Sequence, residues 1–397
     1  MKYLILVGDG MCDYPIAELG NKTPLEYAKT PNMDFLAKNG KLGLTKTIPD
    51  GMSPASDVAN LAIFGYDPKI YYSGRGPLEA ANSGVELGDD DVAFRCNLIT
   101  ACDDKLLDYS AGHISTREAA VLIKFLDEKL GSNEVRFHPG VSYRHLMVIK
   151  GRALNTRCVP PHDITGREFK KYLPRGEDAQ FLISLMQEAR KLLSEHEVNQ
   201  VRLDLKENPA NMIWLWGQGK RPHLISFKDK YGINGSVISA VDLIKGIGRS
   251  CGLEVINVEG ATGYYDTNYK GKAEAALDSL KKEDLVYVHV EAPDEASHNG
   301  DLQQKILAIE RFDQLVVGTV FTALKDNRDF RVLLIPDHAT PLTLRTHTAD
   351  SVCFALFGRG ISACGLDGFN ESEAKKSEIF LENAHLLMDR LIKEEEI

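Results

Sequence analysis

Three acidic residues stand directly after apolar segments of the kind that form buried strands. Asp9 follows YLILVG, Asp294 follows LVYVHVEAP and Asp337 follows VLLIP. The carboxyl ends of parallel strands lie along one edge of a sheet, and ligands bind outside that edge. We therefore expect the three carboxylates to lie close together. Bare like charges at such spacing repel one another and require a compensating cation.

Three histidines accompany these acids. His298 comes four residues after Asp294, a spacing that places both side chains on one face of a helical turn. His338 directly follows Asp337, and His347 lies a short loop later. Imidazole and carboxylate ligands together suit Mn²⁺, Zn²⁺, Co²⁺ or Fe²⁺ better than Ca²⁺. The three histidines and the three acids, Asp9 included, form a set of candidate ligands. This set is too large for one ion and divides well between two.

Each of these residues has an ordinary structural explanation when it is considered alone. An acid and a histidine four residues apart often lie on a solvated helix face, and an Asp after a strand is often a helix cap or turn former. A single histidine such as His347 is often a surface loop residue. Their convergence on the ends of predicted strands favours the metal-binding interpretation.

Ser56 is the candidate nucleophile. The segment PDGMSPASDVANLA places Ser56 at the start of a predicted helix, where free backbone N–H groups and the helix dipole favour a phosphate. A serine hydroxyl is a weak nucleophile at neutral pH, and coordination to a metal ion is one way to activate it. The alternative is an ordinary N-cap, for which Ser56, with Asp57 in the first turn, is also well suited.

These residues depend on a sheet and helices that the pattern of apolar residues predicts. Uniformly apolar segments of strand length alternate with segments of helical period, which is typical of an α/β fold with a mostly parallel sheet flanked by helices. The clearest predicted strands are residues 3–7, 285–290, 331–335 and 351–357. The predicted helices are residues 56–64, 116–130, 178–196, 237–249, 272–281, 303–324 and 373–393.

The middle of the chain differs from its two ends. It is richer in Pro, Gly and Arg and contains strand-like segments at 92–98 and 145–149. We therefore predict a smaller inserted α+β domain over residues 76–231 and a discontinuous catalytic domain formed by residues 1–75 and 232–397. A chain of 397 residues is long enough for two such domains.

Composition and charge restrict the class of protein. The hydrophobic fraction of 43% and the charged fraction of 26% are those of a soluble globular protein. No apolar segment approaches the roughly 20 residues that span a bilayer, and the N-terminal apolar run is too short for a signal peptide. The net charge of -10 argues against a nucleic-acid surface, and the scattered cysteines argue against a structural zinc site. We expect a cytoplasmic protein with a small-molecule substrate and no nucleic-acid or membrane partner.

Several motifs resemble those of a known family. They are GDG at 8–10, PASD at 54–57, GRGPLEAA at 74–81, FRCN at 94–97, GATGYYDTNYKGKA at 260–273, EAPDEASH at 291–298, PDHATP at 336–341 and THT at 346–348. The set resembles cofactor-independent phosphoglycerate mutase of the archaeal type, a family of the alkaline phosphatase superfamily. The resemblance spans nearly the whole chain, and the ordered metal-binding motifs are highly specific to the superfamily.

The resemblance implies two divalent metal ions, Mn²⁺ first and Mg²⁺, Co²⁺ or Zn²⁺ as alternatives, and no 2,3-bisphosphoglycerate. The implied ligands are Asp9, Ser56, Asp337 and His338 for one ion and Asp294, His298 and His347 for the other. In the implied mechanism Ser56 takes the phosphoryl group from 3-phosphoglycerate, and the phosphoserine returns it to the 2-hydroxyl of the reoriented glycerate. The inserted domain would close over the substrate and exclude water, which would otherwise hydrolyse the phosphoserine.

The same motifs imply substrate contacts. Bidentate arginines suit carboxylate and phosphate groups, and structural ion pairing is the alternative explanation. The implied contacts are a catalytic one from Arg75 and binding ones from Arg95, Arg144, His145, His162 and Asp163. Lys245 is the lysine expected to reach the phosphoryl group, and Lys272 is its competitor. His113 stands where the family pattern has an arginine, and Trp214 and Trp216 are expected to be packing residues.

Two other functions remain open from the sequence. Some relatives within the family resemble kinases of small hydroxy amino acids such as homoserine, which would use the same metal site on another substrate. No P-loop is present, although this fold would not need one. The other alternative is a catalytically idle metal-binding or scaffold protein, against which the intact Ser56 and the full set of candidate ligands argue.

Overall fold

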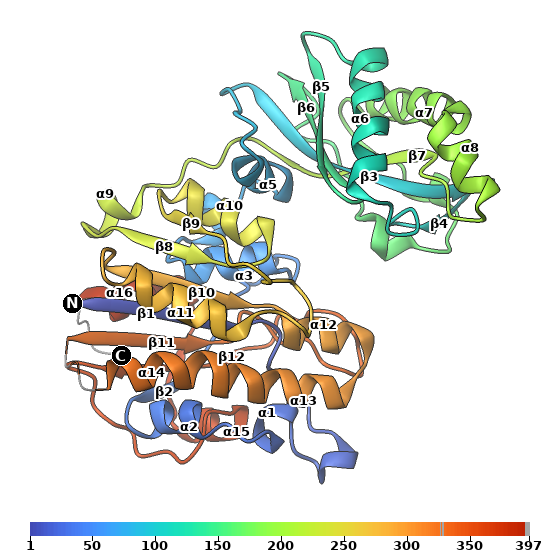
Figure 1. Ribbon diagram of the computed structural model, residues 1–397. Helices are drawn as coiled ribbons and strands as arrows, with labels where there is room; N and C mark the ends of the chain where they lie inside the picture. Colours follow the sequence, from blue (N-terminus) through green and yellow to red (C-terminus); the bar gives the residue numbers. More distant parts are fainter. Residues whose placement is uncertain (326, 328, 394–397) are drawn as a thin grey trace. The chain divides into compact units, whose positions relative to one another are not determined.

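The computed structural model describes residues 1–325, 327 and 329–393. These residues form two compact units (Figure 1, coloured along the sequence from blue to red). Unit 1 consists of Met1–Tyr72 and Leu224–Ile397, and unit 2 of Ser73–His223. Unit 2 is thus inserted into the chain of unit 1. It begins at 73 and ends at 223, where the sequence predicted 76 and 231.

Unit 1 is built on an eight-stranded sheet with the order β13-β2-β12-β11-β1-β10-β8-β9. Neighbouring strands are parallel except at β12, which is antiparallel to β11 and β2. The strands are β1 Lys2–Gly8, β2 Lys41–Thr45, β8 Gly235–Ile238, β9 Glu254–Ile256, β10 Leu285–Val290, β11 Phe330–Ile335, β12 Val352–Gly358 and β13 Phe380–Leu381. The predicted α/β class with a mostly parallel sheet is confirmed.

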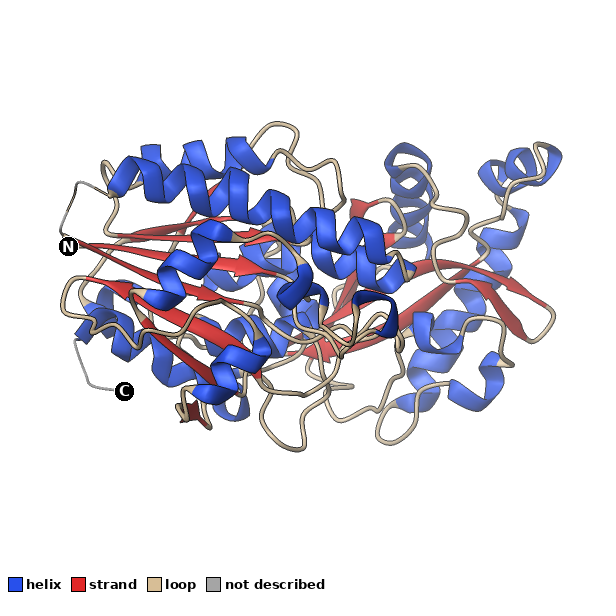
Figure 2. Cartoon of the chain, turned by 90° about the horizontal axis from the view of Figure 1, so that it is seen from below, coloured by secondary structure: helices blue, strands red, loops and turns tan. Residues whose placement is uncertain are grey.

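The central strands β10, β1 and β11 are buried along almost their whole length because helices cover both faces of the sheet, as Figure 2 shows. A strand exposed on one face would instead alternate apolar with polar residues. The parallel register pairs Gly8 with Val290 and Val7 with Ile335. The three strands therefore end at the same level, and the residues that follow them start from one edge of the sheet.

The helices of unit 1 connect these strands. They are α1 Pro24–Tyr27, α2 Pro31–Lys38, α3 Ser56–Ile63, α4 Pro68–Tyr71, α9 Phe227–Tyr231, α10 Asp242–Ser250, α11 Tyr269–Ser279, α12 Ala292–Asn299, α13 Leu302–Arg311, α14 Gly318–Leu324, α15 Glu371–Lys376 and α16 Leu387–Lys393. A π-helical segment, Phe312–Val317, joins α13 to α14. None of the described helices combines the length and apolarity needed to cross a membrane.

Two helix predictions were wrong. The helix expected at 237–249 begins only at Asp242, because the preceding residues form the short buried strand β8 next to β10. The helix expected at 373–393 is interrupted between α15 and α16 by β13, which pairs with β2. In both cases pairing with a strand distant in the sequence overrides a local helical pattern.

Unit 2 has an antiparallel sheet in which β3 lies between β6 and β7 and also pairs with β4, and β6 pairs with β5. Its elements are α5 Arg75–Ser83, β3 Asp91–Cys102, β4 Lys105–Asp108, α6 Thr116–Leu130, β5 Val135–Val141, β6 Arg144–Lys150, α7 Ala179–Glu195, α8 Glu197–Asp204 and β7 Met212–Gly219. Alternate residues of β3 enter different cores. Phe94 packs in the larger core with residues of α6 and α7, and Ala93 packs in a smaller one with Ala80 of α5.

Candidate metal centre and active site

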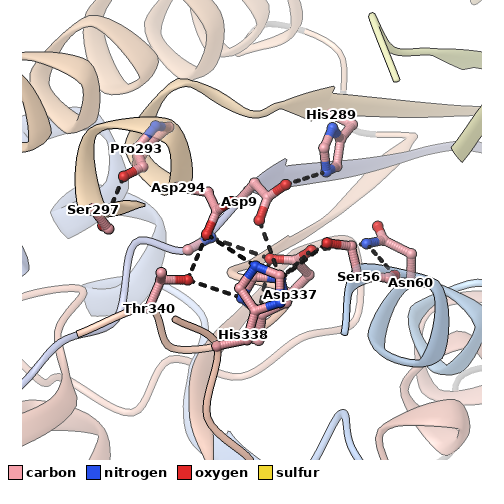
Figure 3. A network of polar contacts seen from close by, with 12 residues as sticks. Asp9, Ser56, Asn60, His289, Pro293, Asp294, Ser297, Asp337, His338 and Thr340 are labelled. Atoms are coloured by element: carbon pink, nitrogen blue, oxygen red, sulfur yellow. Dashed lines mark hydrogen bonds and ion pairs between the residues drawn. The ribbon is translucent and has the colours of Figure 1, made fainter. Parts of the chain in front are cut away.

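Asp9, Asp294 and Asp337 lie together at the edge formed by β10, β1 and β11 (Figure 3). All three are buried, with exposed fractions of 2%, 5% and 0%. Gly10 permits this approach: its φ is +63°, and a Cβ there would lie 2.7 Å from Asp294 Oδ1. The Gly10 N–H donates to Asp337 Oδ1 at 3.2 Å. The three strand ends thus bring three carboxylates together, as the sequence predicted.

Asp294, His298 and His347 form one group of converging ligand atoms. His298 Nε2 lies 3.0 Å from Asp294 Oδ2, and His347 Nε2 lies 3.5 Å from Asp294 Oδ1. The two Nε2 atoms are themselves 3.0 Å apart. Because two imidazole nitrogens and a carboxylate face one point, a cation at that point would satisfy all of them.

Asp9, Asp337 and His338 form a neighbouring group, which Ser56 joins. His338 Nε2 lies 3.4 Å from Asp9 Oδ1, 3.5 Å from Asp337 Oδ2 and 3.1 Å from Ser56 Oγ. Asp9 Oδ1 is fully buried and has no hydrogen-bond partner among the residues that the structure describes. An unsatisfied buried carboxylate oxygen is costly, and a metal ion beside it would remove that cost.

Two of the histidines are held by their Nδ1 atoms. His298 Nδ1 lies 3.0 Å from the carbonyl oxygen of Arg345, and His338 Nδ1 lies 3.1 Å from Thr340 Oγ1. A carbonyl only accepts, so His298 keeps a proton on Nδ1, and Nε2 is the nitrogen that can give up its proton to bind a metal ion. This is how metal-ligating histidines are oriented in proteins.

Ser56 is the first residue of α3 and is not its N-cap, which corrects the alternative explanation from the sequence. The N-cap is Ala55, with φ -165° and ψ 149°, and no side chain caps the helix. The Ser56 hydroxyl instead lies against His338 at 3.1 Å. It is therefore directed to the carboxylate cluster.

Asn60, one turn after Ser56 on α3, ties this helix to the carboxylates (Figure 3). Its Nδ2 donates to Asp337 Oδ2 at 2.8 Å and to the Ser56 carbonyl at 2.9 Å. Its Oδ1 accepts from the hydroxyl of Tyr287, whose ring stacks on Phe64 at 4.0 Å between centroids. The sequence analysis missed Asn60, although its i+4 spacing from Ser56 on one helix face was a usable signal.

The buried charges shift the pKa values of the group in opposite directions. Burial, then repulsion from Asp337 and Asp294, raises the pKa of Asp9 well above its usual value. Burial also opposes ionisation of Asp294, but hydrogen bonds led by that from His298 hold its pKa well below the usual range. Burial lowers the pKa of His338 to about 4, so this ring is neutral near pH 7. The raised pKa of Asp9 shows that its carboxylate lacks a nearby positive charge to balance it.

His289 and Lys272 are buried beside the acids. His289 Nε2 lies 3.2 Å from Asp9 Oδ2, and its carbonyl accepts from Lys272 Nζ at 2.9 Å. Burial lowers the pKa of Lys272 to about 8; the charge of Glu291 opposes this shift and that of Lys245 adds to it. The two lysine candidates are therefore close enough for the charge of one to affect the other. The sequence analysis missed His289, whose signal was a histidine within the otherwise buried strand LVYVHV.

In unit 2 the arginines Arg75 and Arg95 share one carboxylate. Arg75 Nε lies 3.0 Å and an Arg95 guanidinium nitrogen 2.8 Å from Glu79 Oε1. Both guanidiniums also lie over the ring of Trp216, at 5.6 and 4.9 Å from its centroid. Burial lowers the pKa of Arg95 to about 10. Trp216 thus supports two cations in addition to packing, whereas Trp214 is a buried packing residue as expected.

The other predicted substrate residues also lie in unit 2, and the charge of Arg95 acts on His145, while that of Arg144 acts on Arg95. His145 is buried, and burial lowers its pKa to about 3, so it is neutral. Arg144 is exposed at the start of β6. The ring of His162 contacts Trp216 edge-on at 5.4 Å between centroids. Asp163 is exposed, 3.7 Å from His162 Nε2.

Comparison with known sequences finds one family repeatedly. A family profile described as 2,3-bisphosphoglycerate-independent phosphoglycerate mutase matches residues 37–199. A protein of that name from Methanosarcina acetivorans is 53% identical over 397 residues, which cover 99% of this chain and 100% of the relative. A protein named as a probable 2,3-bisphosphoglycerate-independent phosphoglycerate mutase from Geobacter sulfurreducens is 50% identical over 397 residues, with the same coverage.

Solved structures agree with the sequence comparison. The PH0037 protein from Pyrococcus horikoshii matches with a TM-score of 0.83 and 31% identity, covering 100% of this chain and 98% of its own. A cofactor-independent phosphoglycerate mutase from Thermoplasma acidophilum matches with a TM-score of 0.66 and 28% identity, covering 99% of both chains. The similarity therefore extends over both units.

Proposed function

This chain belongs to the family of 2,3-bisphosphoglycerate-independent phosphoglycerate mutases, and from that premise we propose that it interconverts 3-phosphoglycerate and 2-phosphoglycerate with Ser56 as the phosphoryl carrier. The observation that supports this role is the position of the Ser56 hydroxyl, 3.1 Å from His338 Nε2 and beside the buried carboxylates. The first position of α3 also suits a phosphoserine, because the positive end of the helix dipole favours its negative charge.

The donor set fits two divalent metal ions. Asp9 Oδ1 is buried without a partner, and the Nε2 atoms of His298 and His347 face each other at 3.0 Å beside a carboxylate. We assign one ion to Asp9, Ser56, Asp337 and His338 and the other to Asp294, His298 and His347. The family resemblance implies Mn²⁺ first, with Mg²⁺, Co²⁺ or Zn²⁺ as alternatives, and the imidazole ligands suit a transition metal better than Mg²⁺. When bound, such ions lower the pKa of the serine hydroxyl and neutralise the phosphoryl oxygens.

The reaction divides into two transfers to and from Ser56. Ser56 Oγ attacks the phosphorus of 3-phosphoglycerate, the bond from phosphorus to the 3-oxygen breaks, and that oxygen takes up the proton that the serine loses. The glycerate then turns without leaving, and its 2-hydroxyl attacks the phosphoserine. The bond from phosphorus to Ser56 Oγ breaks, and Ser56 Oγ takes up the proton of the 2-hydroxyl. This step releases 2-phosphoglycerate, so no water is consumed. Water must be excluded while the phosphoserine exists.

We assign substrate recognition to the arginines of unit 2 and to one lysine of unit 1. Arg75 and Arg95 together carry two positive charges against one on Glu79, which leaves net positive charge for a carboxylate or phosphate. Lys245 stays our choice for the phosphoryl contact because it is partly exposed. The Lys272 amine is buried and already donates to the carbonyl of His289.

An enolase-coupled assay with 3-phosphoglycerate and Mn²⁺, without 2,3-bisphosphoglycerate, tests this function. We expect metal-dependent turnover that falls below detection in Ser56→Ala and is unchanged in Ser53→Ala, an exposed serine of the same segment. Unchanged turnover in Ser56→Ala would remove the phosphoserine mechanism. Activity with homoserine and ATP in place of phosphoglycerate would reassign the site to the kinase alternative.

A further inference from the structure

Thr340 joins the two groups of candidate ligands. It lies three residues after Asp337 in the loop that follows β11, and its exposed fraction is 0%. Its hydroxyl donates to Asp294 Oδ1 at 2.6 Å, and the same oxygen lies 3.1 Å from His338 Nδ1 (Figure 3). One side chain therefore contacts a ligand assigned to each ion.

The count of protons fixes the direction of both hydrogen bonds. A threonine hydroxyl has one proton, and an ionised carboxylate can only accept, so the proton of Thr340 goes to Asp294. The oxygen of Thr340 must then accept from His338, which places the His338 proton on Nδ1. His338 Nε2 is left with its lone pair, which faces Ser56 Oγ at 3.1 Å and Asp9 Oδ1 at 3.4 Å.

The backbone around Thr340 is held from several sides. Its carbonyl accepts from Lys305 Nζ at 3.0 Å, and its N–H donates to the carbonyl of Cys12 at 3.2 Å. The buried Lys305 amine also contacts Asp13 Oδ2 at 2.7 Å, and that oxygen accepts the N–H of Leu342 at 3.1 Å. These contacts hold the backbone of Thr340 in place, so its hydroxyl forms a rigid link between Asp294 and His338.

We propose that Thr340 is a positioning residue that couples the two metal sites, an inference that rests on the metal assignment of the proposed function. Its hydroxyl orients the carboxylate of Asp294 and at the same time selects the metal-binding tautomer of His338. Loss of this hydroxyl leaves Asp294 Oδ1 without this donor and leaves His338 Nδ1 beside an apolar group. The affinities for both ions should therefore fall together.

Calorimetric titration of the metal-stripped full chain with Mn²⁺ tests this coupling. We expect two ions per chain for the wild type. Thr340→Val, which keeps the shape and removes the hydroxyl, should weaken both by about 10- to 100-fold, the usual effect of losing a group that orients a metal ligand. Thr340→Ser should retain most of the affinity. Thr343→Val makes the same change at an exposed position of this loop and should bind like the wild type.

The outcomes separate the two proposals. A wild type that binds no Mn²⁺ contradicts the metal assignment itself. If the wild type binds two ions and Thr340→Val binds them with equal affinity, the metal assignment is supported and the proposed role of Thr340 is wrong. Loss of one ion only would overturn the coupling. If Thr340→Val and Thr340→Ala both unfold without metal, as judged by circular dichroism, Thr340 is a structural residue and the proposal is wrong.

Discussion

Buried charge is handled differently in the two units of this protein. In unit 1, three carboxylates face one another, and no described residue gives Asp9 Oδ1 a hydrogen bond. In unit 2, the carboxylate of Glu79 is matched by Arg75 and Arg95, which also lie over the ring of Trp216. The first cluster carries an excess of negative charge, whereas the single carboxylate of the second is paired with two guanidiniums, which leaves an excess of positive charge. An excess of buried negative charge is what we expect of a metal-binding site, and an excess of buried positive charge is what we expect of an anion-binding site.

Removal of one charge from the cluster of unit 1 should have the largest effect. We expect Asp9→Asn to lower mutase activity by more than about 100-fold, because it removes one of the proposed metal ligands. The same change should stabilise the metal-free protein, since burial and the neighbouring acids Asp337 and Asp294 raise the pKa of Asp9 and make its charge unfavourable. Turnover and thermal unfolding in EDTA measure the two effects.

The control for this experiment is Asp278→Asn, which removes an exposed carboxylate paired with Lys281 on the surface. Surface pairs contribute little, so neither activity nor stability should change appreciably. A metal-free Asp9→Asn protein that is less stable than the wild type would show that the carboxylates are satisfied without a cation. That result would remove the contrast between the two units.

Removal of the corresponding charge in unit 2 should act in the opposite direction. Glu79→Gln leaves the buried guanidinium of Arg95 without its partner, which we expect to cost about 3 kcal/mol of unfolding free energy. Urea unfolding of the metal-free protein measures this. Glu86→Gln, an exposed acid after the same helix, is the matched control. A Glu79→Gln protein as stable as the wild type would mean that water, and not the Glu79 carboxylate, stabilises the charge of Arg95.

Loss of a hydrogen bond to Asn60, the residue that links the helix of Ser56 to Asp337, should have a smaller effect on stability. Tyr287→Phe removes the hydroxyl that donates to Asn60 Oδ1 and leaves that buried oxygen unsatisfied. We expect a loss of about 2 kcal/mol in unfolding free energy, with the ring stacked on Phe64 unchanged. Urea unfolding with Tyr27→Phe, at an exposed tyrosine, as the control measures it. Equal loss in the two variants would show that the network does not hold α3 in place.

The smallest effect is a dependence on pH in unit 1. Burial opposes protonation of His298, but its contact with Asp294 raises its pKa to about 9 from 6.5. A raised pKa means that protonated His298 stabilises the metal-free fold fully below about pH 6.5 and loses that contribution as the pH rises through about 9. Thermal unfolding in EDTA should therefore show the stability difference between the wild type and His298→Gln shrinking over this range. A difference independent of pH would contradict the pairing.

The parts of this site that the sequence predicted share a physical cause. β1, β10 and β11 are buried on both faces, so their uniform apolar runs identify them, and the acids after them mark one sheet edge. Asp9, Asp294 and Asp337 were found in this way. β8 and β13 were missed because they are short and exist through pairing with β10 and β2, which local periodicity does not record.

The residues that orient the site were harder to predict. Thr340, Asn60 and His289 are ordinary residue types inside a loop, a helix and a strand, and their roles appear only through contacts with distant residues. The local sequence favoured the role of Ser56 as an N-cap, and only the conformation of Ala55 shows that the hydroxyl is not used in that way. Residues at strand ends can be predicted from the sequence, whereas hydrogen bonds between distant segments cannot.

Direct capture of the phosphoryl group on the serine tests the account most sharply. The protein, loaded with Mn²⁺ and 3-phosphoglycerate, is quenched in acid, digested and analysed by mass spectrometry for a phosphoryl group on the peptide that contains Ser56. We expect phosphorylation at Ser56 that disappears when the metal is removed with EDTA and in Asp9→Asn. Turnover accompanied by phosphorylation of another residue, or by none under any quench time, would contradict the account.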